Sequence, residues 1–230
     1  MSLTSSNNML AERLQIVRDG ISKACAAEGR DSADVTLIVV TKFHPVSTMR
    51  ELFALGVRDF GENRHQEAER KAEELQDLEM RLHFIGQLQS NKAAAVRRYA
   101  DVVHSVDRPA LVTALGKASA EPIECFLQLN LTDDPGRGGV APSELSELAE
   151  LAAATASLRV MGVMAVAPLQ VDPRQAFVKV RECSEALRAI IPEAVYISAG
   201  MSYDYAEAIA EGATHLRIGT AITGERPPTS

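Results

Sequence analysis

The sequence contains no tryptophan and only three cysteines, Cys25, Cys125 and Cys183, among its 230 residues. The cysteines are odd in number, widely spaced and form no CxxC pair, which argues against a disulfide framework and against a structural zinc site. The five histidines are scattered, with no HxH or HExxH spacing. We therefore expect no metal centre and expect the three cysteines to be small buried apolar residues.

Excess positive charge and long apolar segments are also missing. Lysine and arginine number 24 against 31 acidic residues, a formal net charge of -7. This balance argues against a surface for nucleic acid or for an anionic membrane. No segment has the apolar length of a membrane span or of a signal-peptide core, so we expect a cytoplasmic protein.

Aromatic residues make up only 4% of the chain. With no obvious exposed apolar stripe, this favours a monomer. At the N-terminus, the polar stretch 1–8 is expected to be disordered or to be an addition to the natural chain, and an amphipathic helix is predicted from Met9 to Glu28.

Strand and helix patterns alternate along the remaining sequence. We predict eight strands: Leu37–Thr41, Val57–Gly61, Leu82–Gly86, Val102–Val106, Ile123–Asn130, Arg159–Val166, Ala194–Ser198 and His215–Gly219. Segments with helical periodicity separate them, which is typical of a parallel α/β sheet. The length of the chain favours one closed (β/α)8 TIM barrel over residues 1–230, with no linker or second domain.

The ends of the predicted strands are where such barrels carry their functional residues. The first strand lies in TLIVVTKFHP, Thr36 to Pro45, and it ends in Lys42. Side chains alternate along a strand, so Lys42 shares a face with Ile38 and Val40. By the same alternation Arg217, in the last strand, points into the barrel.

A buried guanidinium needs a hydrogen-bond acceptor, because it does not lose its proton. The strand-end carboxylates available to Arg217 are Glu62 and Asp107. Another basic side chain, His83, falls within the third strand, and we interpret it as a packed core residue in preference to a ligand.

Small residues follow the last strand at Gly219, Thr220 and Ala221, where backbone N–H groups can approach an anion. The loops after strands seven and eight commonly bind phosphate in these barrels, and Ser202 adds a hydroxyl after strand seven. Strands eight and one are neighbours in a closed barrel, so Lys42 lies within reach. A lysine beside a phosphate site suggests a Schiff base with a phosphorylated aldehyde.

Six segments carry a family resemblance: VTKFHP, FGENRHQE, LHFIGQLQSNK, HSVDR, GVMAV and SAGMSYDYAEAIAEGATHLRIGTAITGER. Together they resemble the pyridoxal phosphate homeostasis protein family, whose barrel is similar to the N-terminal domain of alanine racemase. The resemblance extends from about Val17 to Arg226. The sequence departs from the usual family pattern at Arg64, Leu82, Arg137 and Thr223, which affects only the packing of the rim and the loop around Arg137.

The resemblance implies that the chain binds pyridoxal 5'-phosphate (PLP) through Lys42, Asn63, Ser202, Arg217, Gly219 and Thr220. Lys42 would form the Schiff base, and Arg217 would face the pyridine nitrogen. Ser202 and the backbone at Gly219 and Thr220 would hold the phosphate, and Asn63 would lie near the cofactor ring. The implied role is PLP (vitamin B6) homeostasis, with PLP-dependent apo-enzymes as candidate recipients.

Three functions remain open at this point. The favoured one is a non-catalytic protein that holds PLP, because an arginine facing the pyridine nitrogen weakens the ring as an electron sink. A weak amino-acid racemase needs a second acid/base group, for which Tyr203 and Tyr205 are the candidates. A Schiff-base aldolase would use Lys42 directly. The loop from Asp133 to Gly139 is a surface turn, or an anion site through Arg137.

Overall fold

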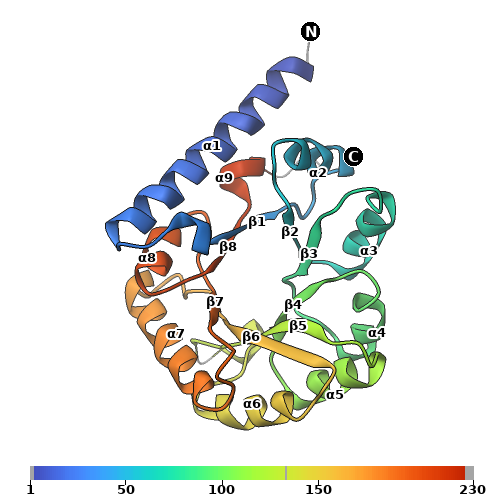
Figure 1. Ribbon diagram of the computed structural model, residues 1–230, viewed down its shortest axis with the longest axis vertical. Coiled ribbons are helices and arrows are strands. Elements are labelled where there is room, and N and C mark those ends of the chain that lie inside the picture. The colour runs from blue at the N-terminus through green and yellow to red at the C-terminus, as the bar shows by residue number, and fades with distance from the viewer. Residues whose placement is uncertain (1–2, 133, 226–230) are drawn as a thin grey trace.

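Eight parallel strands close into a barrel in which β1 pairs with both β2 and β8 (Figure 1). This computed structural model describes residues 3–132 and 134–225. The strands are β1 Thr36–Val40, β2 Asp59–Glu62, β3 Arg81–Phe84, β4 Val102–Val106, β5 Ile123–Gln128, β6 Leu158–Met164, β7 Tyr196–Ser198 and β8 His215–Ile218. The predicted (β/α)8 TIM barrel is confirmed.

Each predicted strand has a counterpart, and no boundary differs by more than two residues. β2 and β7 begin two residues later than predicted, and β3, β5 and β6 end two residues earlier. Val57 donates its N–H to the carbonyl of Leu52 and thereby closes the helix before β2. Ala194 donates to Ile191 in the same way before β7. These residues therefore belong to the connections before the two strands, although their buried, apolar side chains indicate strand in the sequence.

Helices surround the barrel (Figure 1). They are α1 Leu3–Ala27, α2 Val46–Ala54, α3 His65–Glu74, α4 Ala93–Val96, α5 Pro109–Ala118, α6 Leu145–Ala153, α7 Pro173–Arg188, α8 Tyr205–Ala210 and α9 Thr220–Thr223, with 3₁₀ turns η1 Ser32–Asp34, η2 Ser90–Lys92, η3 Pro135–Arg137 and η4 Pro142–Glu144. Figure 1 shows α1 running beside α8 and α9.

The first helix begins at Leu3 and not at Met9. The stretch Leu3–Asn8, expected to be disordered, is helical because it contains no proline or glycine and each added residue extends the helix by one hydrogen bond. Met1 and Ser2 lie outside the described residues, as do Asp133 and the stretch 226–230.

Two separate sets of apolar side chains are buried. The larger set lies between the strands and the helices, and the smaller one, Val102, Phe126, Met161 and Met164, forms its own cluster. A Cβ placed on Gly61 would meet the side chains of Ile38, Ile85 and Val40. The predicted alternation along β1 is therefore present. Full burial of an isoleucine or valine side chain stabilises a fold by about 1.5–3 kcal/mol.

The cysteines are buried and free, as the sequence predicts. Burial raises the pKa of Cys125 to about 12, so its thiol stays protonated. The described residues contain no helix that combines the length and the hydropathy required to span a membrane.

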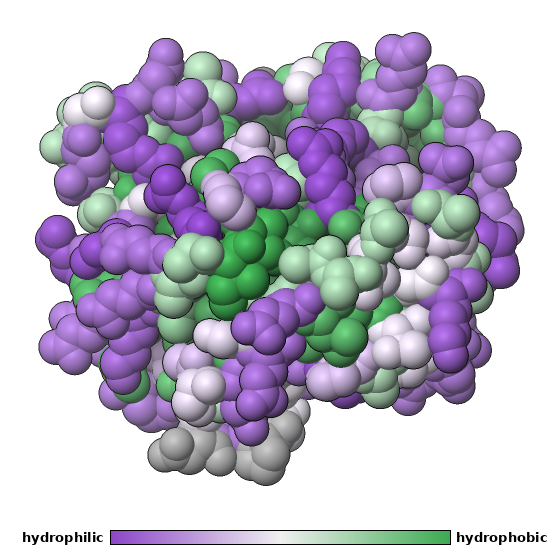
Figure 2. Space-filling model, turned by 60° about the horizontal axis from the view of Figure 1, so that its bottom comes forward, coloured by the Kyte–Doolittle hydropathy of each residue, from purple (hydrophilic) through white to green (hydrophobic). Residues whose placement is uncertain are grey.

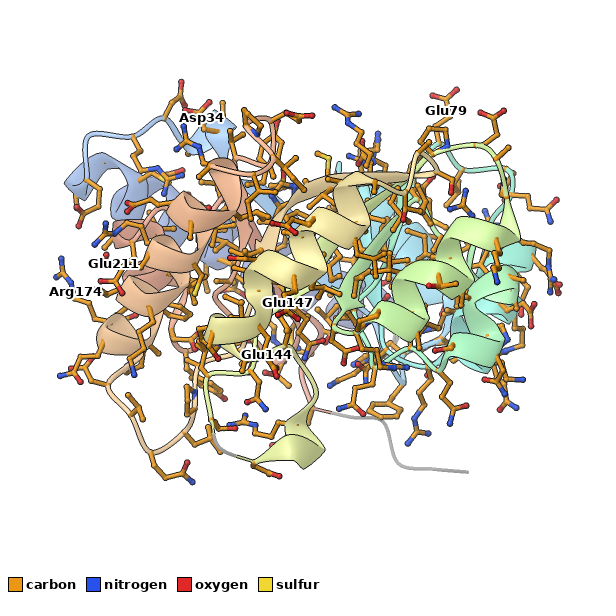
Figure 3. All side chains as sticks on the ribbon, turned by 90° about the horizontal axis from the view of Figure 1, so that it is seen from below. Asp34, Glu79, Glu144, Glu147, Arg174 and Glu211 are labelled. Atoms are coloured by element: carbon orange, nitrogen blue, oxygen red, sulfur yellow. The ribbon has the colours of Figure 1, made fainter. Side chains whose placement is uncertain are left out.

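Hydrophilic residues cover much of one face of the molecule (Figure 2). On the face drawn in Figure 2, hydrophilic residues surround a smaller hydrophobic area. Arg174 of α7 lies beside Glu211, which follows α8 (Figure 3), with Nε 3.2 Å from Oε1. Arg181 contacts the second carboxylate oxygen of Glu211 at 3.2 Å. Glu211 therefore ties two neighbouring helices together.

Candidate functional site

A cavity of about 340 Å³ opens at the carboxyl ends of the strands. Its lining consists of Val40, Lys42, Asn63, Ile85, Met164, Val166, Met201, Ser202, Tyr203, Arg217, Gly219 and Thr220. All six residues that were predicted from the sequence to bind the cofactor are among them. The structure thus brings together side chains from four different strand ends, although their role in binding a cofactor stays a prediction.

Lys42 follows β1 and is exposed within this cavity. The residues on both sides of it are fixed. Thr41 is buried and donates its hydroxyl to Glu62 at 2.7 Å. Phe43 donates its backbone N–H to Glu67 at 2.6 Å and has a φ of 69°, a left-handed conformation that bulky side chains rarely adopt. Such strain persists only where the surroundings enforce it, and it commonly marks functional sites.

Helix α3 supplies the side chain that holds this turn. The Nζ of Lys71 donates to the Thr41 carbonyl at 2.8 Å and lies 2.7 Å from both Glu62 Oε1 and Glu67 Oε1. Burial raises the pKa of Glu62, while Lys71 and the Thr41 hydroxyl act in the opposite direction. The backbone on each side of Lys42 is thus anchored through one buried ammonium group.

The role of Lys71 was not predicted from the sequence. A lysine in a charged, amphipathic segment is normally interpreted as solvent-exposed. The available signal is spacing, because Lys71 lies three residues after Ala68 and four before Leu75, and both of these are buried. Lys71 therefore shares the buried face of α3.

Arg217 points into the barrel from β8, as predicted, and is only 5% exposed. Its acceptors are not the carboxylates that the sequence offered. Nη1 donates to Ser198 Oγ at 2.6 Å and Nη2 donates to the Ala165 carbonyl at 2.8 Å. Burial lowers the pKa of Arg217 to about 10, with Asp204 acting in the opposite direction, so the guanidinium remains charged at neutral pH.

Hydroxyl and backbone donors collect at one side of the cavity. Ser202 Oγ lies 3.4 Å from Thr220 Oγ1, and the N–H of Ala221 lies 3.4 Å from the same Ser202 oxygen. Gly219 precedes α9 and its carbonyl accepts from the N–H groups of Ile222 and Thr223, so the N–H groups of a first turn that lack intrahelical acceptors are here those of Thr220 and Ala221. This group of donors suits an anion with several oxygens.

Asn63 reaches the cavity because the backbone of the next strand end is very close to it. A Cβ on Gly86 would lie 2.0 Å from the Asn63 carbonyl oxygen. Only glycine leaves room for this approach. Gly86, which the sequence analysis places at the end of the third strand, therefore fixes the position of Asn63.

The two candidate acid/base tyrosines are in different surroundings. Tyr203 lines the cavity mouth and is 93% exposed. Tyr205 begins α8, and its hydroxyl would lie 2.2 Å from a Cβ placed on Gly20 of α1. Its phenol is therefore directed toward α1.

His83 is a packed core residue, as interpreted from the sequence. It is fully buried and its ring nitrogens contact Asp59 and His104, each at 2.9 Å. The described part of the chain contains no group of His, Cys, Asp and Glu side chains that could hold a metal ion.

The loop after β5 contacts the segments that follow β3 and β4. Asp133 is outside the described residues, but Gln87 donates to the Gly136 carbonyl at 3.3 Å and Gly139 donates to Asp107 at 3.2 Å. Arg137 is exposed in the 3₁₀ turn η3. These contacts are those of a surface turn.

The family model of the alanine racemase N-terminal domain matches the chain over residues 26–227. The pyridoxal phosphate homeostasis protein of Corynebacterium glutamicum is 42% identical over 208 residues, which cover 86% of this chain and 93% of that protein.

Two solved structures place the fold among known barrels. PipY of Synechococcus elongatus PCC7942, solved with PLP bound, is 35% identical and aligns with a TM-score of 0.79 over 94% of this chain and 100% of that one. The alanine racemase of Corynebacterium glutamicum aligns with a TM-score of 0.72 over 97% of this chain and 62% of that one. At 17% identity, the racemase shows a common fold alone.

Proposed function

We propose the function from one premise, that the chain belongs to the pyridoxal phosphate homeostasis protein family. It binds PLP in the cavity at the carboxyl ends of the strands, as a Schiff base on Lys42, and serves in PLP homeostasis without substantial catalysis. PLP-dependent apo-enzymes are the proposed recipients of the cofactor. In support, the relatives are named for pyridoxal phosphate homeostasis, and PipY has been solved with PLP bound.

The observation that supports this proposal is that a single cavity contains one amine, one guanidinium and the group of anion-binding donors around Ser202 and Thr220. PLP supplies an aldehyde that condenses with an amine, together with a phosphate and a pyridine nitrogen. Lys42 offers the amine, Ser202 and Thr220 offer donors for the phosphate, and Arg217 offers N–H groups for the ring nitrogen. The apolar side chains of Val40, Ile85 and Met164 suit the flat faces of the ring.

A holding role fits the cavity better than catalysis does. Of its lining residues only Lys42, Tyr203 and Arg217 carry titratable side chains, and Tyr203 is almost fully exposed. Exchange of an α-proton on both faces of the cofactor requires two positioned acid/base groups. The guanidinium of Arg217 leaves the pyridine nitrogen unprotonated, which weakens stabilisation of a carbanion.

The first test is visible absorbance of the purified protein with PLP, before and after borohydride. The expected result is a band in the wild type that borohydride removes, and no such band in Lys42→Ala. Lys92→Ala is the matched control, since Lys92 is also exposed but lines the neighbouring cavity. Absence of the band in the wild type, or its loss in Lys92→Ala alone, contradicts the assignment of Lys42.

The second test separates holding from racemisation. The PLP-loaded protein is incubated with alanine in deuterated water, and deuterium at the α-carbon is followed by NMR. We expect no incorporation above that of free PLP. Incorporation that depends on Lys42 and is lost in Tyr203→Phe would instead establish a weak racemase.

A further inference from the structure

A continuous row of hydrogen-bonding side chains crosses the interior of the barrel to Arg217. Asp59 Oδ1 lies 2.9 Å from His83 Nε2, and His83 Nδ1 lies 2.9 Å from His104 Nε2. His104 Nδ1 lies 2.9 Å from Ser198 Oγ, which accepts from Arg217 Nη1 at 2.6 Å. Asp59 opens β2 and Arg217 lies near the end of β8, so the row joins opposite ends of the barrel.

The chemistry of its two ends gives the row a single direction. Arg217 can only donate, so the Ser198 oxygen accepts from it and the hydroxyl hydrogen of Ser198 is available to His104 Nδ1. An ionised Asp59 can only accept, so His83 Nε2 carries a hydrogen. With neutral rings, both histidines are then Nε2–H tautomers, and both ends of the row require the same arrangement.

The central histidines lie away from water. His83 and His104 are fully buried, and the ring of His104 stacks on Phe126 with centroids 4.6 Å apart. Burial, with His83 and Arg217 nearby, lowers the pKa of His104 well below its ordinary value, so this ring is neutral. A neutral imidazole accepts at one nitrogen and donates at the other. Each ring can therefore accept on the side of Arg217 and donate on the side of Asp59.

We propose that Asp59, His83, His104 and Ser198 are positioning residues for Arg217, and that their row of one-way hydrogen bonds keeps its remaining N–H groups directed at the pyridine nitrogen of PLP. The inference rests on the proposed function. Two of the five N–H groups of the guanidinium are used by Ser198 and Ala165, and the others remain for the cavity. If the row is broken, the Ser198 hydroxyl is free to turn, and the guanidinium loses a fixed acceptor.

Two buried histidines on the same aromatic ring provide a matched comparison. His215 also contacts Phe126, with centroids 5.1 Å apart, but its Nδ1 pairs with Thr214 Oγ1 outside the row. We expect His104→Leu to weaken PLP binding by roughly tenfold, the effect of losing one or two buried hydrogen bonds. His215→Leu is expected to change affinity by less than about twofold, and His104→Gln, which can accept and donate, to recover part of the loss.

The 15N chemical shift of the pyridine nitrogen, measured with 15N-labelled PLP, provides a readout that general loosening of the fold would not reproduce. The expected outcome is a shift in His104→Leu away from the wild-type value and none in His215→Leu. If His104→Leu does not fold, the same 15N shift is measured in Asp59→Asn, which changes the partly exposed end of the row. Its amide can turn a donor toward His83 and remove the fixed direction.

The direction of the row is testable without any cofactor. Long-range 1H–15N NMR spectra of the free protein at about pH 8, above the ordinary imidazole pKa, report which ring nitrogen carries hydrogen. Nε2–H in both His83 and His104 is expected. An Nδ1–H tautomer of His104, or an imidazolium at His83, overturns the inference, as does equal loss of PLP affinity in the two leucine variants.

The two proposals fail in different ways. A wild-type protein that does not bind PLP contradicts the proposed function, whatever the tautomers are. A wild-type protein that binds PLP, while His104→Leu keeps the same affinity and the same 15N shift, contradicts only the positioning role.

Discussion

Lys71 Nζ lies 2.7 Å from Glu62 Oε1, and both side chains are fully buried. The pair joins α3 to the end of β2, and through the Thr41 carbonyl it also reaches the residue before Lys42. A buried ion pair is not in itself a large source of stability, because both charges lose their hydration. Its consequence here is geometric, since it fixes the backbone that carries the reactive amine.

Removing one partner of this pair is expected to be costly. Lys71→Met leaves Glu62 and Glu67 without their ammonium, and we expect the free energy of unfolding to fall by about 3–5 kcal/mol. Urea denaturation measures this change. Arg70→Met is the control, because Arg70 lies on the exposed side of the same helix and pairs there with the exposed Glu74. Its expected effect is within about 0.5 kcal/mol.

A double variant distinguishes loss of the pair from loss of packing. Lys71→Met combined with Glu62→Gln removes both charges, so part of the lost stability returns if the uncompensated carboxylate is the cause. Additive losses in the double variant would show that the charges are not coupled.

The close approach at Gly86 leads to a second prediction. Gly86→Ala places a methyl group against the Asn63 carbonyl, so the backbone carrying Asn63 must move. We expect PLP affinity to fall about tenfold or more, because displacements of this size disrupt a positioned site. Affinity is measured by titration with PLP. In Gly29→Ala the added Cβ contacts nothing, so only a loss of stability of about 1 kcal/mol is expected, with PLP affinity unchanged.

The anion-binding donors around Ser202 and Thr220 predict that Ser202→Ala affects the affinity for PLP and for pyridoxal differently. Ser202→Ala removes a hydroxyl beside Thr220 and the Ala221 N–H. PLP binding is expected to weaken by about tenfold, because a hydrogen bond to a charged group is lost. Pyridoxal, which has no phosphate, is expected to bind wild type and variant within about twofold. Equal weakening for the two ligands would place Ser202 away from the phosphate.

The strand ends could be predicted from sequence because they depend on local patterns. Apolar runs located the strands, and alternation correctly directed Arg217 into the barrel and placed Lys42 on the face of Val40, with which it lines the cavity. The acceptors of Arg217 were not predicted. Ser198 ends β7 and Ala165 follows β6, and a side-chain hydroxyl and a backbone carbonyl give no distinctive sequence signal. Lys71 was missed because its partners lie at the carboxyl ends of β1 and β2 as well as in its own helix. Contacts of this kind depend on the closed barrel and not on any one segment.

Acid stability provides the last prediction. Burial, with His83 as the next contribution, lowers the pKa of His215 to about 4, against an ordinary value of 6.5. As pH falls below 6.5 the unfolded chain takes up a proton that folded His215 does not, so stability is complete above that pH and is lost toward pH 4. His215→Gln removes this linkage. We expect the loss of unfolding free energy between these two pH values to be smaller in the variant by up to about 3 kcal/mol.

Urea denaturation across this pH range measures how steeply the unfolding free energy changes with pH in the two proteins. Comparing these slopes cancels any packing cost that is the same at every pH. His104 remains in the variant and retains its own part of the acid destabilisation, so a reduced slope, and not a flat one, is the expected result. Identical slopes in the two proteins would mean that His215 is protonated equally in folded and unfolded chains.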